Sequence, residues 1–170
     1  KEKKDLKLKT DYFEKAEKSY NDYIDRYKIP FSLGSNVELN KLQKIKWEEH
    51  DKKIFAITNN LAYIKYEGKQ YEKAREIYLK ITNWQMENWT NVNRDEMKKD
   101  AYLMLPLTYY KESKWADAII AYRDAKDRYA ASVEAPVIGM RIAECLQNMG
   151  DFAGAKLELD ASKWALELSN

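Results

Sequence analysis

The 170-residue chain carries 30 Lys and Arg side chains and 28 Asp and Glu side chains, so its formal net charge is only +2. Such a balance gives no electrostatic basis for binding nucleic acid, and a hydrophobic content of 45% is too high for an intrinsically disordered chain. With 5 Gly, 3 Pro, 1 Cys and 1 His, the composition argues against a many-stranded β fold. It also excludes an intrachain disulfide and nearly all metal sites built on thiolates or paired imidazoles.

The apolar spacing predicts helices along the whole chain. In the first, from Leu6 to Tyr27, large side chains recur at steps of three and four, which is typical of one buried helix face. A second helical region runs from about residue 36 to Tyr66, and its polar middle leaves open one helix or two that meet near Asp51. Further helices are predicted over about residues 70–89, 94–112 (with a kink at Pro106), 114–131, 135–149 and 151–168. Because no segment alternates as a strand does, we predict an all-α protein of about seven helices.

One spacing of large and small side chains recurs along these helices. A small residue lets two helices approach closely, and the larger residues around it fill the space toward the next helix. The pattern is Tyr71-x-x-Ala74-x-x-x-Tyr78-x-x-Ile81, Trp115-x-x-Ala118-x-x-x-Tyr122-x-x-Ala125 and Phe152-x-x-Ala155-x-x-x-Leu159-x-x-Ser162, with a fourth copy at Phe13-x-x-Ala16-x-x-x-Tyr20-x-x-Tyr23.

With the helices that precede each copy, this pattern resembles the tetratricopeptide repeat (TPR) family. Those helices supply Leu61-Ala62, Leu105-Pro106-x-x-Tyr109 and Ile142-Ala143-x-x-Leu146. The resemblance implies an α-solenoid of stacked antiparallel helix pairs in one domain, residues 1–170. Its expected parts are a half-repeat at 5–29 and units at about 36–89, 93–131 and 134–168.

The chain also departs from the family pattern. Ala74 and Ala118 are 44 residues apart and Ala118 and Ala155 are 37 apart, against a family period near 34. Pro106 stands where the family has a small residue. We expect the first turn to hold one extra residue, which would place Tyr66 one step late. A non-repetitive helical bundle is the alternative.

A second resemblance concerns the segment from Tyr129 to Pro136 and the run Gly150-Asp151-Phe152. It is similar to bacterial cell-envelope TPR proteins, such as the TPR lipoprotein of the β-barrel assembly machinery and the periplasmic TPR partner of the Tol-Pal system. Ala130 replaces a Pro that is usual there. The resemblance implies a periplasmic or outer-membrane-associated protein. The chain starts at Lys1, so we expect a processed protein or part of a longer chain, and no stretch is apolar enough for direct membrane insertion.

The family architecture places the first helix of each pair on the concave face, where a second apolar stripe would form a groove. Tyrosine and leucine anchors with a polar rim suit a peptide or a partner helix. The alternative is that Leu103 and Leu107 pack against a neighbouring helix. We predict a binding stripe made of Asn59, Tyr63, Leu103, Leu107, Tyr110, Met140, Glu144 and Gln147.

These features predict a non-catalytic scaffold that binds a protein or peptide partner and carries no cofactor or metal. His50 has acidic neighbours but no second His, and Cys145 has no base near it in sequence, so neither forms a catalytic motif. The alternative function is a structural subunit, a homodimer or part of a larger complex, that associates through its terminal helices. Its candidate face comprises Tyr20, Leu157 and Trp164.

Overall fold

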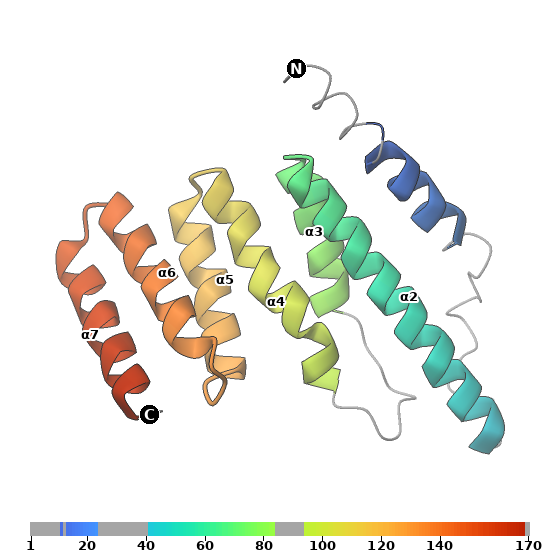
Figure 1. Cartoon of the computed structure of the whole chain (residues 1–170). Helices are drawn as coiled ribbons and strands as arrows, with labels where there is room; N and C mark the ends of the chain where they lie inside the picture. The colour runs from blue at the N-terminus through green and yellow to red at the C-terminus, as the bar shows by residue number, and fades with distance from the viewer. Residues whose placement is uncertain (1–10, 12, 24–40, 84–93, 169–170) are drawn as a thin grey trace. The chain divides into compact units, whose positions relative to one another are not determined.

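The structure is a computed structural model that describes residues 11, 13–23, 41–83 and 94–168 (Figure 1). Within these ranges it contains seven helices and no strand, which confirms the predicted all-α class. A helix over residues 13–23 is followed by α2 (Lys41–Glu67), α3 (Tyr71–Thr82), α4 (Arg94–Lys111), α5 (Trp115–Arg128), α6 (Ala135–Asn148) and α7 (Phe152–Leu168).

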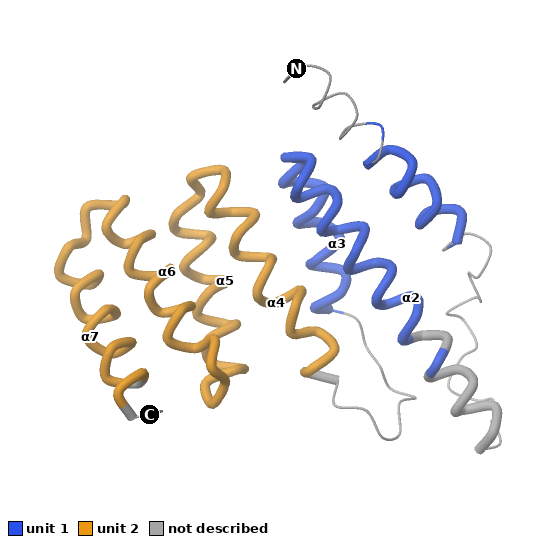
Figure 2. The backbone as a smooth tube through the Cα atoms, viewed as in Figure 1, with its two compact units in different colours: residues 1–93 blue, residues 94–170 orange. Residues whose placement is uncertain are grey.

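The chain divides into two compact units, residues 1–93 and residues 94–170 (Figure 2). In the first unit α2 and α3 pack against each other as a hairpin. In the second, α4 packs on α5, α5 on α6, and α6 on α7. Each helix therefore packs mainly on its neighbours in sequence, which is the arrangement of an all-α helical repeat.

The structure corrects one predicted helix break and one predicted helix end. The helix α2 continues through Asp51 without a break, so the two-helix alternative is wrong. The helix α3 ends at Thr82 and Asn83 lies in a turn, so the predicted continuation past Thr82 is wrong, and residues 84–89 lie outside the described part of the chain. Pro106 lies fully buried inside α4, which continues on both sides of it.

The three turns that close the helix pairs share one geometry. In each, a single residue adopts a left-handed backbone conformation: Lys69 (φ 60°), Ser113 (φ 58°) and Gly150 (φ 84°). The amide of the next residue then donates to the carbonyl five residues earlier, as in a Schellman motif. These bonds are Gln70 N to Lys65 O at 2.8 Å, Lys114 N to Tyr109 O at 3.0 Å and Asp151 N to Leu146 O at 2.9 Å.

This shared geometry corrects the predicted alignment of the first repeat. Since Lys65 accepts the bond that Tyr109 and Leu146 accept elsewhere, these three positions are equivalent. Tyr66 is then the counterpart of Tyr110, and the first turn holds no extra residue. Lys65 is buried at a position that is aromatic or aliphatic in the other units, and its ammonium is paired with the Glu17 carboxylate of the helix over residues 13–23.

The recurring small residues lie where the helices of each pair meet. Ala74, Ala118 and Ala155 are all buried, and their helices α3, α5 and α7 each pack on the preceding helix. The helices α6 and α7 approach closely at Gly139. A Cβ atom added to this glycine would lie 2.1 Å from Ser162 Oγ, so a larger residue fits there only if the Ser162 side chain moves.

The turn geometry predicts opposite stability effects at two equivalent positions. Gly150→Ala places a Cβ in the left-handed region, and we expect the free energy of unfolding to fall by about 1 kcal/mol. No atom lies within 4 Å of that added Cβ, so backbone strain is the only cost. Ser113→Gly removes the same strain and should raise stability by up to about 1 kcal/mol. Urea unfolding followed by circular dichroism measures both, and a neutral Gly150→Ala would contradict the shared turn.

The close contact of α6 and α7 predicts that a second substitution restores the stability that a first one removes. Gly139→Ala should lower the free energy of unfolding by about 1–3 kcal/mol because Ser162 Oγ must move. Combining it with Ser162→Ala should restore most of this loss, since the new Cβ would then face Ser162 Cβ at 3.4 Å. Helix propensity alone predicts that Gly139→Ala stabilises by about 1 kcal/mol. A stabilised single variant would therefore show that the helices do not meet there.

Candidate functional site

The turn geometry sorts the predicted binding stripe into equivalent positions of successive first helices. Counting back from the left-handed residue, Tyr63, Leu107 and Glu144 share one position. Asn59 and Tyr63 belong to the first unit and the other six residues to the second. The remaining equivalent sets are Asn59 with Leu103 and Met140, and Tyr66 with Tyr110 and Gln147.

In the second unit the apolar part of the stripe lies on α4. Leu103, Leu107 and Tyr110 are half-buried and pack against the core formed by α4, α5 and α6. Each side chain therefore contributes to the core and still presents part of its surface to solvent. Met140 and Gln147 lie exposed on α6.

Tyr110 lies at the centre of a polar and aromatic cluster that joins the end of α4 to α6. The Trp115 ring meets the Tyr110 ring edge to face, with the ring centroids 5.2 Å apart. The Arg141 guanidinium lies 5.7 Å from the centroid of the same ring, and its Nη1 donates to Glu144 Oε2 at 2.8 Å. Burial, together with the charge and hydrogen bonding of the Glu144 carboxylate, raises the pKa of Tyr110.

The predicted stripe includes Tyr110 and Glu144 but not Arg141, the basic residue near them in the sequence. The available signal was the spacing of Arg141 and Glu144, because residues three apart on a helix are neighbours and form ion pairs. The pair holds the guanidinium beside the Tyr110 ring, which a single basic residue in the sequence does not indicate.

Tyr122 brings an unused hydrogen-bonding group to this cluster. Its side chain is only 3% exposed, and its hydroxyl has no hydrogen-bond partner in the described part of the chain. Burial raises the pKa of Tyr122 above its usual value, and the nearby charges of Arg141 and Glu144 also act on it. An unpaired buried hydroxyl costs about 1–3 kcal/mol, so this group lowers the stability of the fold locally.

In the first unit the corresponding surface is aromatic. Tyr63 is half-exposed and stacks on Tyr66, with the ring centroids 6.5 Å apart, and Tyr66 meets Tyr71 edge to face at 5.6 Å. One turn before Tyr63, Asn59 has a buried Oδ1 with no hydrogen-bond partner among the described residues. Asn59 and Tyr63 are four residues apart and lie on one side of α2, where Tyr63 is exposed and the Asn59 Oδ1 is buried.

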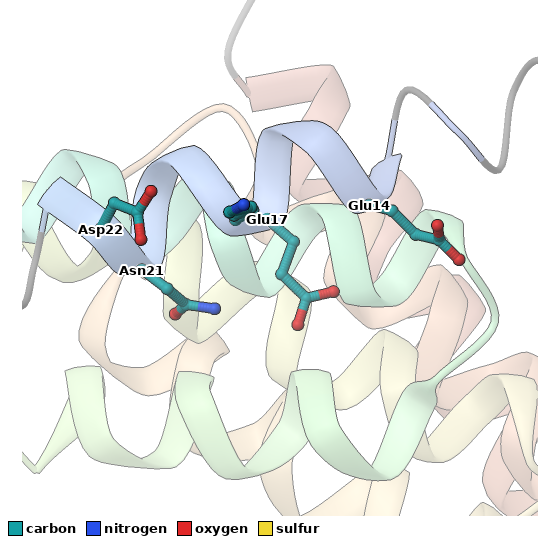
Figure 3. A pocket seen from close by; sticks show the side chains of 5 residues that line it. Glu14, Glu17, Asn21 and Asp22 are labelled. Carbon is teal, nitrogen blue, oxygen red and sulfur yellow. The ribbon is translucent and has the colours of Figure 1, made fainter.

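The helix over residues 13–23 carries a shallow polar hollow (Figure 3). Five polar side chains of this one helix line it, and Glu17 is already paired with Lys65. In the described part of the chain, no group of three or more His, Cys, Asp or Glu side chains could hold a metal ion. The hollow is lined by Glu14, Glu17, Lys18, Asn21 and Asp22.

The candidate residues of the terminal face differ in exposure. Leu157 and Trp164 are exposed on α7, and Tyr20 is half-buried on the helix over residues 13–23. The side chain of His50 lies outside the described residues.

Cys145 is buried in the core of the second unit. Burial raises the pKa of its thiol to about 11, and the Glu144 carboxylate adds to the shift. The sulfur is therefore a protonated core atom near neutral pH, which is the opposite of an activated nucleophile.

This pKa shift predicts that the Cys145 thiol reacts slowly in the folded protein. At pH 8 we expect Ellman's reagent to label the folded protein at least about 100-fold more slowly than the protein unfolded in guanidinium. Ionisation favours the unfolded chain, so stability falls as the pH rises from about 9 toward 11. Cys145 is the only cysteine, so Cys145→Ser provides the unlabelled control. Equal labelling rates in the two states would place the thiol at the surface.

Comparison with known protein families, with curated proteins and with solved structures finds no match to this chain. Among the helices that the structure describes, none combines the length and apolar character required to cross a membrane. The fold and the site define an all-α helical repeat with a half-exposed apolar and aromatic stripe on its first helices.

Proposed function

We propose that this protein is a non-catalytic scaffold of the TPR type that binds a peptide or helix of a partner protein along its first helices. The observation that carries the proposal is the partial exposure of Leu103, Leu107 and Tyr110. The three residues lie along one side of α4. The helix α6 carries other stripe residues at the equivalent positions, with Glu144 at the position of Leu107.

The chemistry of the stripe suits a partner segment with apolar side chains and a polar backbone. Leu103 and Leu107 offer anchoring contacts, and Tyr110 combines a ring for packing with a hydroxyl for hydrogen bonding. Beside them, the Arg141–Glu144 pair supplies donors and acceptors at the rim.

The proposed setting is an assembly of the bacterial cell envelope. This part rests on the resemblance of the segment from Tyr129 to Pro136 to periplasmic and outer-membrane TPR proteins. A partner that belongs to the envelope would support it, and a cytoplasmic partner would argue against it.

The proposal predicts that a double substitution in the stripe removes the partner. Leu107→Glu/Tyr110→Lys should abolish capture of the partner from the native cell. With the identified partner peptide, we expect the dissociation constant to rise by at least about tenfold, as for the loss of an interface anchor. Titration calorimetry measures this constant after circular dichroism has shown that wild type and variant are equally helical.

The matched control changes two exposed apolar residues away from the stripe. Ile120→Glu on α5 together with Met149→Lys after α6 makes the same exchange of apolar for charged groups. This control should bind as wild type does. If the stripe variant binds unchanged, or the control loses binding equally, the stripe is not the binding site.

A further inference from the structure

The outer side of α7 carries a row of alternating charges between two apolar strips. Lys156, Asp160, Lys163 and Glu167 follow one another at steps of four, three and four, so they form a line along the helix. All four side chains are exposed. On one side of the row lie Leu159 and Leu166, and on the other side lie Leu157 and Trp164, each pair seven residues apart.

Comparison of α7 with the equivalent helix α5 indicates that part of this face corresponds to a surface that another helix covers. Leu159 stands at the position that Tyr122 occupies on α5. Tyr122 is 3% exposed because α5 lies against both α4 and α6, whereas Leu159 is 48% exposed. Among the described helices, α7 has only α6 as a main packing partner. Leu157 is 71% exposed and Trp164 65%, which is unusual for large apolar groups on one helix.

The order of the charges indicates which helix would cover the face. Along α7 the row reads positive, negative, positive, negative. A second α7 that lies antiparallel reads the reverse, so Lys156 meets Glu167 of the second copy and Asp160 meets Lys163 of the second copy. A second α7 that lies parallel in the same register would oppose each charge to its like. Of these two in-register arrangements, the antiparallel one opposes unlike charges along the whole row, and it is the one that a two-fold axis perpendicular to the helix generates.

We infer that α7 pairs with α7 of a second copy of this chain, antiparallel about a two-fold axis. Such an interface is isologous, so each of the two ion pairs occurs twice. On each side of the row, the apolar strip would then contact the same strip of the second copy, and Trp164 is the largest side chain in these contacts. Within one chain Lys163 Nζ lies 3.9 Å from Glu167 Oε1, a long contact that leaves both groups able to pair across the interface. The inference does not depend on the proposed partner-binding stripe.

Sedimentation equilibrium of the full chain tests this inference. Wild type should show twice the mass of one chain at micromolar concentration, and Trp164→Glu should be monomeric and equally helical. Lys156→Glu/Lys163→Glu makes the whole row negative, and Asp160→Lys/Glu167→Lys makes it positive. We expect each of these variants to dimerise at least about 100-fold more weakly than wild type.

An equimolar mixture of the negative and positive variants restores opposite charges and should again sediment as dimers. Combining all four substitutions in one chain should restore the homodimer. As a control, Lys111→Glu/Asp117→Lys changes exposed charges of α4 and α5 and should dimerise as wild type does. A monomeric wild type, a dimer that survives Trp164→Glu, or charge variants that fail to pair when mixed would each overturn the inference.

Discussion

The architecture depends on one backbone constraint, the left-handed residue that ends each first helix. A chain that reverses between two packed helices must leave the right-handed region at one residue, and here that residue lies at the same place in three turns. Lys69 and Ser113 adopt the conformation despite the strain that a side chain incurs there. Since the next amide returns to the carbonyl five residues earlier, the turn determines which face of each helix is directed inward.

This constraint connects packing with the candidate site. With the turn in place, the small residues Ala74, Ala118 and Ala155 lie at the helix crossings. The same alignment places Tyr110 next to Arg141 and Glu144, and it leaves Leu107 at the half-exposed edge of the core. The residues of this surface stabilise the helix pair and keep part of their own surface exposed to solvent, as the proposed partner binding requires.

The helical class and the bounds of the later helices could be predicted from the sequence because the signals for them are local. Pro136 at the start of α6 and Gly150 after its end are such signals, and both helix ends were predicted within one residue. The first turn was misread because its glycine, Gly68, stands one residue before the left-handed residue Lys69, whereas in the third turn the left-handed residue is the glycine itself, Gly150. Lys65 was harder still, since its burial depends on Glu17, which lies 48 residues earlier in the chain. The Arg141 contact with Tyr110 likewise joins two helices that only the folded structure brings together.

The central claim is that three helix pairs share one turn and therefore one alignment of their exposed residues. The most direct measurement is the backbone φ angle at residues 69, 113 and 150 by NMR, from three-bond amide to Hα couplings and chemical shifts. Our account predicts positive φ at all three. A right-handed conformation at any of them would shift that first helix by a residue relative to the others. Asn59, Leu103 and Met140 would then no longer be equivalent, and the shared alignment of the three first helices would be contradicted.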